Sequence, residues 1–410
     1  MSMQRECRRR WLIACMVVIA GCQSGGHAIA PVATGVKPMP TKMDVGIDSP
    51  VVFRFATVGD SRQEPNNPGN TAQDEIWLQS TAVWARMLHE IERQRPQALI
   101  FNGDMVYGYR KDLAALDREY AFWRGMIAGL MERGTYVMPV PGNHEVQWSE
   151  TKSDGSTVKA AVEVKEHAWR ANMGDLIIDV ARWQKLTGTD LNAWHIGNTP
   201  AQTRDGGADG ISTDQRQLSY SFDVGEIHIA VINTDPVGND ASAPTAWLAR
   251  DMGAAQIRGA KRFFVFGHKP AFTYFPEGAD KKKADGFDGR PALRDAFWDV
   301  IEKYDATYFC GHQHVYHASQ PRIAQGGKAW QVIAGTGGSP FSIKPRQSAR
   351  LEDRLYAWVD VSVHKNGGVL MQAWGFDENF DATRLIESRM LSPPLIYTDI
   401  HVPMIPPSSR

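Results

Sequence analysis

The chain has 410 residues, of which 43% are apolar and 22% are charged, and its formal net charge is −1. These values are typical of a globular protein and exclude a largely disordered chain. The nearly neutral charge gives no sign of the basic surface that nucleic-acid binding requires. A chain of this length can bury a large core, while its oligomeric state is left open by the sequence.

The N-terminus has the pattern of a targeting segment. Its first ten residues include four arginines, and the apolar stretch from Trp11 to Ala20 is too short to span a bilayer. The sequence Ile19-Ala20-Gly21-Cys22 resembles the lipobox of bacterial lipoproteins. We therefore expect a lipoprotein signal peptide at residues 1–21 and a lipid on Cys22. Cleavage at an ordinary small-residue site, or a short anchor helix, would fit the same pattern.

The lipobox resemblance implies an exported bacterial lipoprotein that is attached to the membrane through its N-terminal lipid. Gln23 follows Cys22. In lipoproteins of Gram-negative bacteria, Asp at that position favours retention at the inner membrane. We therefore expect this chain at the periplasmic side of the outer membrane or at the cell surface. Residues 22–49 are rich in Gly, Pro, Ala and Thr without helical or strand periodicity, which predicts a flexible tether.

Predicted strands and helices alternate from residue 50 onward. The apolar patterns predict strands at Val51–Val58, Ala98–Phe101 and Tyr136–Val140, and helices at residues 73–94 and 112–133. This alternation is typical of a sheet that is covered by helices. In such sheets the active site lies beyond the carboxyl ends of the strands.

Residues 147–215 interrupt the alternation and predict an insertion that lies over or beside the site, with one or two helices within residues 164–186. The pattern then resumes with a hairpin at residues 220–233, helices at 247–257 and 293–304, strands at 262–266, 307–310 and 331–334, and an antiparallel pair at 355–363 and 368–374. We assign residues 50–380 to one domain and residues 381–410 to a Pro-rich C-terminal tail.

Polar side chains that can bind metals follow the ends of the predicted strands. The five motifs are GDSR at Gly59–Arg62, NGDMVY at Asn102–Tyr107, GNHE at Gly142–Glu145, GH at Gly267–His268 and GHQH at Gly311–His314. Each motif supplies Asp, Asn or His, which are oxygen and nitrogen ligands of hard or borderline metals. Together they predict a metal site at one edge of the sheet.

In this order the motifs resemble those of the calcineurin-like metallophosphoesterase superfamily, and they are closest to purple acid phosphatase-like bacterial members. The resemblance covers roughly residues 51–375. It implies an α/β fold, a two-sheet α/β/β/α sandwich of mixed sheets flanked by helices. It also implies a binuclear metal-dependent phosphoesterase, in which a metal-bound hydroxide attacks a small-molecule phosphate ester. The expected cofactors are two divalent or trivalent ions, Fe together with Fe, Zn or Mn.

The resemblance also implies which residues hold the metals, with Asp104 as a shared bridging ligand. One metal would take Asp60, Asp104, Tyr107 and His314, and the other would take Asp104, Asn143, His268 and His312. His144 follows the expected Asn ligand and would protonate the leaving group or stabilise charge in the transition state. A structural role for His144 stays open. We expect His228, which lies within a predicted strand, to be structural.

The first motif departs from the superfamily pattern. Arg62 stands where the superfamily has a ligand histidine, while Tyr107 matches the Gly-Asp-x-x-Tyr motif in which a tyrosinate binds Fe(III). We expect Tyr107 to replace the missing ligand, although a packed aromatic residue would also fit. Arg62 is expected to act in catalysis by binding a phosphate oxygen through its planar fork, or else to form a salt bridge with Glu64.

Two alternative functions fit the same sequence. A phosphodiesterase or phospholipid-directed hydrolase of the same superfamily would be compatible with the membrane tether. A non-catalytic surface binding protein could keep the fold and use the Trp-rich insertion as its interaction face. The complete set of expected ligands favours the enzyme, because a degenerate site is expected to have lost one of them.

Overall fold

The computed structural model describes residues 47–395 apart from residues 68, 70, 178, 190–192, 196–206 and 278–283. The expected signal peptide, Cys22 and nearly all of the expected tether lie outside the described residues, so export and lipidation stay predictions. Within the described part, no helix combines the length and the apolar character needed to cross a membrane.

Two mixed sheets form the centre of the domain. The six-stranded sheet has the order β15-β14-β13-β1-β2-β3 and the seven-stranded sheet has the order β11-β12-β10-β9-β8-β7-β6. The first sheet consists of β1 (Val51–Val58), β2 (Ala98–Phe101), β3 (Tyr136–Pro139), β13 (Tyr356–His364), β14 (Val369–Phe376) and β15 (Arg384–Ser392). The second consists of β6 (Ala193–His195), β7 (Tyr220–Val224), β8 (Ile227–Val231), β9 (Arg262–Phe266), β10 (Thr307–Cys310), β11 (Tyr316–Ser319) and β12 (Trp330–Ala334).

The two sheets pack face to face through aromatic side chains. The ring of Phe55 on β1 lies 5.2 Å from that of Phe264, 5.6 Å from that of Phe266 and 5.7 Å from that of Phe309. All four rings are buried. Large aromatic residues at such edge-to-face distances bury much apolar surface, so this cluster is a main source of the attraction between the sheets.

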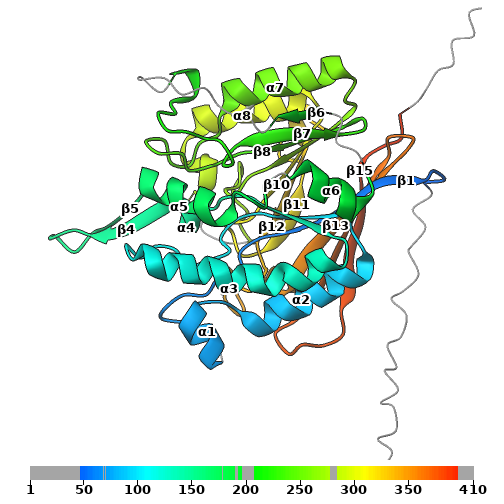
Figure 1. Cartoon of the computed structure of the whole chain (residues 1–410). Helices are drawn as coiled ribbons and strands as arrows, with labels where there is room; N and C mark the ends of the chain where they lie inside the picture. The colour runs from blue at the N-terminus through cyan, green and yellow to red at the C-terminus, as the bar shows by residue number, and fades with distance from the viewer. Residues whose placement is uncertain are drawn as a thin grey trace, which may run out of the picture. The chain divides into compact units, whose positions relative to one another are not determined.

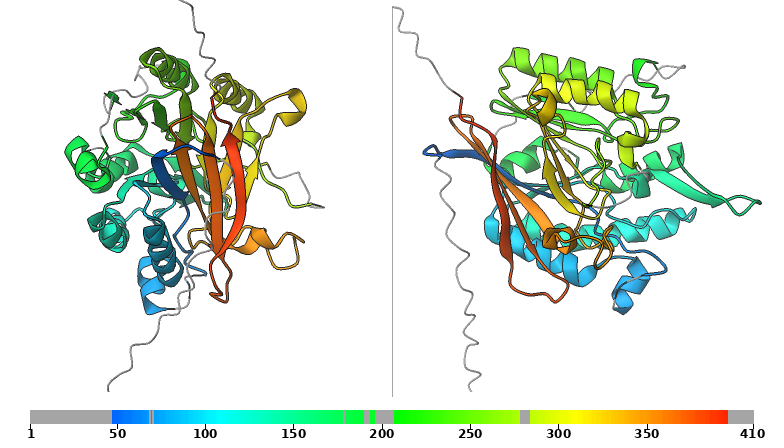
Figure 2. Two further views of the ribbon diagram at one scale, coloured as in Figure 1. Left: turned by 90° about the vertical axis from the view of Figure 1, so that its right-hand side faces the viewer. Right: turned by 180° about the vertical axis from the view of Figure 1, so that it is seen from behind.

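Helices cover both outer faces of the sandwich (Figures 1 and 2). Helices α7 (Thr245–Arg258) and α8 (Pro291–Lys303) share one apolar core with strands β8, β9 and β10. Helices α2 (Thr81–Gln94) and α3 (Leu113–Glu132) lie against the other sheet, where Trp84 and Trp123 each place a ring 5.1 Å from that of Phe101. The predicted two-sheet sandwich with mixed sheets is confirmed.

The single helix predicted at residues 73–94 is instead two helices, α1 (Ala72–Trp77) and α2. Leu78 adopts a left-handed conformation with φ 48°, which ends α1. The carboxylate of Asp74 accepts hydrogen bonds from the backbone N–H and the hydroxyl of Thr81, both at 2.7 Å, and so caps α2. The continuous apolar face that the periodicity predicts does not form, because Asp74 is the only buried residue of α1 and Ile76 is exposed, so periodicity alone gives the wrong boundary.

The C-terminal boundary was also wrong, because β15 lies within the expected tail. This strand pairs antiparallel with β14 at the edge of the six-stranded sheet. Most of its residues are only partly buried, and charged residues interrupt its apolar ones. Charged edge strands have a weak sequence signal, since they pack on one side and discourage pairing with other chains on the other. Residues 396–410 lie outside the described residues.

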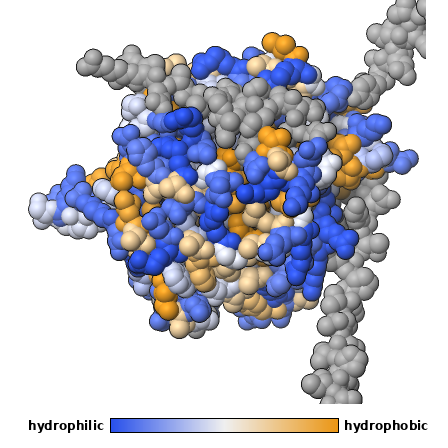
Figure 3. Space-filling view, viewed as in Figure 1, coloured by the Kyte–Doolittle hydropathy of each residue, from blue (hydrophilic) through white to orange (hydrophobic). Residues whose placement is uncertain are grey.

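The described part of the insertion forms a hairpin, two helices, the edge strand β6 and a short 3-10 turn at Gly207–Asp209. The hairpin and the helices are β4 (Gln147–Thr151) with β5 (Thr157–Ala161), α5 (Glu163–Met173) and α6 (Val180–Thr187). Helix α6 places the buried Trp183 between the sheets, with its ring 6.0 Å from Phe53, 5.3 Å from Tyr136 and 5.6 Å from Phe222. The insertion therefore closes one side of the sandwich. The hairpin projects from the domain, and its outer end is mostly hydrophilic (Figure 3).

Candidate metal centre

The expected ligands meet where strands of both sheets end. Asp60 follows β1, Asp104 follows β2 and Asn143 starts α4 (Asn143–Val146) after β3. From the other sheet, His268 follows β9, while His312 and His314 follow β10. Strands β1, β2 and β3 run parallel, as do β9 and β10, so their carboxyl ends lie at the same edges of the sheets.

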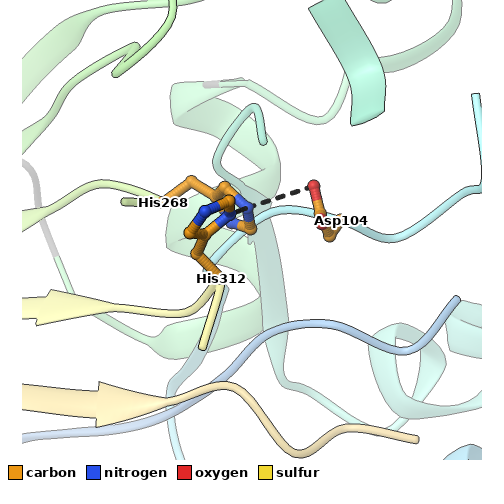
Figure 4. A group of neighbouring side chains, drawn as sticks. All are labelled: Asp104, His268 and His312. Carbon is orange, nitrogen blue, oxygen red and sulfur yellow. Dashed lines mark hydrogen bonds and ion pairs between the residues drawn. The ribbon is translucent and has the colours of Figure 1, made fainter. Parts of the chain in front are cut away.

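Two groups of side chains could each hold a metal ion, and they share Asp104. One group is Asp104, His268 and His312, and the other is Asp60, Asp104 and His314, with the ligand atoms of each group within 4.8 Å of one another. In Figure 4 the two imidazoles of the first group face the Asp104 carboxylate. His268 Nε2 lies 3.1 Å from Asp104 Oδ1, and His314 Nε2 lies 3.4 Å from Asp60 Oδ1.

Each of these three histidines has one ring nitrogen bound to an oxygen acceptor outside the group. His268 Nδ1 donates to the Asn102 carbonyl at 2.8 Å, His314 Nδ1 donates to the Pro340 carbonyl at 2.6 Å, and His312 Nε2 lies 3.0 Å from Asp285 Oδ1. Such contacts fix the ring orientation and leave the other nitrogen free for a metal. The donor set therefore fits two metal ions bridged by Asp104.

Asn143 completes the first group. Its amide oxygen lies 3.0 Å from His268 Nε2, and His312 Nδ1 lies 3.1 Å from the same His268 nitrogen. Burial opposes a charge on His268, but the nearby Asp104 carboxylate raises its pKa to about 9. His268 Nε2 thus faces a carboxylate oxygen, an amide oxygen and a ring nitrogen, a set of atoms that a metal ion could bind.

Close backbone approach requires the glycine before a ligand. A Cβ on Gly142 would lie 2.4 Å from Asp104 Oδ1, and a Cβ on Gly311 would lie 2.2 Å from Asp60 Oδ2. Both distances are far below van der Waals contact. The strand ends lie too close together for a Cβ, which explains why glycine precedes Asn and His in these motifs.

The buried Glu145 holds the loop that carries Asp104. Its carboxylate accepts hydrogen bonds from the backbone N–H groups of Asp104 at 2.8 Å, Met105 at 2.9 Å, Val106 at 3.2 Å and Gly142 at 2.7 Å. Burial and the charge of Asp104 raise the pKa of Glu145 to about 7. Glu145 therefore positions the bridging ligand, a role that its place in the GNHE motif did not indicate.

His144 lies directly against the bridging carboxylate. Its Nδ1 donates to the Tyr107 carbonyl, and its Nε2 lies 3.7 Å from Asp104 Oδ2. Burial and the positive charge of Arg62 hold the pKa of His144 well below its ordinary value. In this state His144 is neutral, with a free Nε2 that faces the candidate metal centre.

Arg62 is buried and contacts two carboxylates. It forms an ion pair with Glu64, and its Nε lies 3.4 Å from Asp104 Oδ2. Burial opposes its charge, but Asp104 and Glu64 together raise its pKa. The expected salt bridge with Glu64 is thus present, and Arg62 also stands beside the bridging ligand, where its free N–H groups could contact a phosphate.

Two tyrosines lie near the centre, and they differ in position. Tyr107 contacts His144 through its carbonyl, and within the described residues its hydroxyl makes no hydrogen bond to Asp60 or Asp104. Its ligation of a metal stays a prediction. Tyr109, which the motif analysis did not single out, places its ring 3.8 Å from that of His144 and accepts a hydrogen bond from the Asn143 amide. Burial, reinforced by the charge of Asp104, raises its pKa well above 10.

Comparison with known protein families identifies the family of this chain. The sequence profile of the calcineurin-like phosphoesterase family matches residues 54–316, more than half of the chain. Curated protein sequences give no match.

Among solved structures, the chain is similar to a purple acid phosphatase isolated from yellow lupin (Lupinus luteus) seeds. The TM-score is 0.50 at 13% identity, over 83% of this chain and 54% of the lupin chain, so this chain spans about half of that structure's length. A dimetal phosphatase from Danio rerio gives a TM-score of 0.40 at 13% identity, over 82% of this chain and all of the other. GAP50, the anchor in the inner membrane complex of Plasmodium, gives a TM-score of 0.43 at 12% identity, over 85% of this chain and 91% of the GAP50 chain. At 13% identity the lupin structure shows the fold alone, whereas the matched profile shows that the chain belongs to the calcineurin-like phosphoesterase family.

Proposed function

We propose that this protein hydrolyses phosphate monoesters with two metal ions bridged by Asp104. The observation that carries the proposal is the pair of ligand groups that share this one carboxylate. Asp60 and His314 would hold one ion, and Asn143, His268 and His312 would hold the other. Bound metal ions in such sites polarise phosphate oxygens and lower the pKa of water.

Two side chains beside the expected ligands would take part in the reaction, Arg62 with its positive charge and His144 with a ring nitrogen that can carry a proton. Arg62 presents a guanidinium beside Asp104 and can bind a phosphate oxygen. A phosphate placed between Arg62 and His144 would offset the positive charge that lowers the His144 pKa. Once protonated, His144 Nε2 could then donate a proton to the leaving oxygen.

Metal analysis combined with turnover tests the proposal. The purified protein is loaded with Fe, Zn or Mn and assayed with phenyl phosphate and with bis(p-nitrophenyl) phosphate. We expect two bound ions per chain and faster hydrolysis of the monoester. Faster hydrolysis of the diester would favour the diesterase alternative, and a metal-free, inactive protein after loading would refute the proposal.

Variants test whether activity depends on the candidate metal centre. We expect Asp104→Asn to reduce kcat/KM by at least about a hundredfold, because loss of a ligand should cost no less than loss of a supporting contact. His89→Asn is the control, since His89 lies on α2 with its side chain exposed and is expected to keep wild-type activity.

A further inference from the structure

The hairpin of the insertion places a lysine beside the candidate metal centre. Lys159 on β5 pairs with Ser149 on β4. The Ser149 N–H donates to the Tyr109 carbonyl at 3.4 Å, which links the hairpin to the loop after β2. Lys159 Nζ lies 4.0 Å from the centre of the Tyr109 ring. Figure 1 shows the hairpin next to α4 and α5.

Three short contacts connect Lys159 with the bridging ligand. The ammonium lies 4.0 Å from the Tyr109 ring, that ring lies 3.8 Å from the His144 ring, and His144 Nε2 lies 3.7 Å from Asp104 Oδ2. Tyr109 also contacts the amide of Asn143. Lys159 therefore contacts the same tyrosine ring as His144, the residue that faces the leaving group in the proposed reaction.

Lys159 differs in its ion pairing from Lys269 and Arg62, two other cations near the centre. Lys269 pairs with the buried Asp235, and Arg62 pairs with Glu64 and Asp104. Across the described part of the chain, no carboxylate lies within ion-pair distance of Lys159. Its side chain is exposed. Packing of its ammonium against the protein and the charge of Arg62 lower its pKa.

A second cation lies over the neighbouring tyrosine ring and adds to the positive potential. The guanidinium of Arg110 lies 5.7 Å from the centre of the Tyr107 ring, and the rings of Tyr107 and Tyr109 are 5.8 Å apart. Two cations on adjacent aromatic rings, neither of them in an ion pair within the described residues, attract an anion to this position. The phosphate that is cleaved would lie at Asp104, so the anion bound here would be a different group.

We propose that Lys159 binds a second anionic group on the substrate's leaving group. The substrate class would then be phosphate monoesters whose leaving group carries a carboxylate or another phosphate, with the buried Tyr109 ring holding the ammonium of Lys159 in position. This inference rests on the proposed function. It assigns to the insertion a role in substrate selection that the fold alone does not reveal.

A matched set of esters tests the inference. The specificity constant kcat/KM is measured for phenyl phosphate and for 3- and 4-carboxyphenyl phosphate with the metal-loaded wild type and Lys159→Met. We expect the ratio of carboxylated to plain ester to fall about fivefold in Lys159→Met, as for the loss of one exposed ion pair. The change should lie mainly in KM, and Lys159→Arg should restore most of the ratio. Added salt should lower the wild-type ratio toward that of Lys159→Met.

Lys111→Met is the matched control. Lys111 also lies over an aromatic ring, with its Nζ 5.6 Å from the centre of the Trp148 ring, but it pairs with Glu150 at 3.2 Å. We expect this variant to keep the wild-type ratio. An unchanged ratio in Lys159→Met, with the plain and the carboxylated esters all hydrolysed, would overturn the inference alone. A loaded wild type that hydrolyses none of the esters would overturn the proposed function and this inference with it.

Discussion

Three of the expected metal ligands have a left-handed backbone conformation that residues other than glycine rarely adopt. Asp60, Asp104 and His312 have φ values of 63°, 55° and 68°. Such a left-handed residue costs about 1 kcal/mol or more when it carries a Cβ. The surroundings hold these residues in place: Glu145 binds the N–H of Asp104, and Asp60 accepts the N–H of His312 at 3.0 Å. Strain at ligand positions supports the interpretation that function determines this geometry.

Asp285 orients His312 and gives a prediction at the scale of one residue. Its carboxylate lies 3.0 Å from His312 Nε2, which leaves Nδ1 toward His268. Asp285→Asn should weaken binding of the metal ion held by His268 and His312 about tenfold or more. The reason is that an amide orients a ligand imidazole less well than a carboxylate does. Metal titration with a competing chelator measures the dissociation constant directly, without an activity assay.

Asp288→Asn is the control for this change. Asp288 belongs to the same short segment, but it pairs with Arg294 and accepts the Thr273 N–H at 3.2 Å. We expect its substitution to leave metal affinity at the wild-type value. Equal affinities in Asp285→Asn and the wild type would show that Asp285 does not support the ligand.

At the scale of elements, a buried histidine connects β7, β8 and α7. On β8, His228 Nδ1 lies 2.6 Å from Asp223 Oδ1 on β7. Its Nε2 lies 3.0 Å from Asp251 Oδ2 on α7. Arg258 also pairs with Asp223 at 2.7 Å. Burial opposes a charge on His228, but the two carboxylates outweigh it and raise its pKa. The structural role predicted for His228 agrees with these contacts.

This contact predicts how stability depends on pH. A histidine with a raised pKa in the folded state contributes stability that is complete below its unfolded pKa of about 6.5. That contribution is lost as the pH rises through the folded pKa. His228→Gln should therefore lower the unfolding free energy by about 3 kcal/mol at pH 6, the cost of breaking a buried pair, and by less at pH 9.

Urea unfolding of the wild type and His228→Gln across this pH range checks the prediction. His89→Gln is the control, because His89 is exposed on α2 and should show no such pH dependence. A stability difference between the wild type and His228→Gln that stays constant from pH 6 to 9 would contradict a protonated His228 between the two carboxylates.

Most elements were predictable where periodicity and burial agree. The strands that carry the motifs and helices such as α3 lie close to their predicted bounds, because each presents one apolar face to the core. The break at Leu78 and the edge strand β15 were not predictable in this way. The first depends on a side-chain cap from Asp74, and the second has little apolar surface to generate a pattern.

At the scale of the molecule, the sequence indicated which strand ends carry ligands but not what supports them. The glycine-ligand pairs stand next to each other in the chain, so a motif reveals them. Asp285, Tyr109 and Lys159 act on residues far from them in sequence, and their roles depend on how the loops and the hairpin fold back. No spacing rule connects Lys159 with Asp104, so the sequence predicted an insertion over or beside the site but not which of its residues approach the centre.

The candidate centre joins the two sheets, which predicts that metal binding stabilises the whole domain. Asp60 and Asp104 come from one sheet and His268 and His312 from the other, so unfolding of either sheet would destroy both metal sites. A ligand that binds only the folded state at a hundred times its dissociation constant stabilises a protein by about 2.7 kcal/mol. We therefore expect the melting temperature of the metal-loaded protein to fall when a chelator is added, and to recover with Zn or Mn. Asp104→Asn removes the shared ligand, so its melting temperature should not respond to either treatment. A metal-dependent shift of wild-type size in Asp104→Asn would show that the metals bind elsewhere.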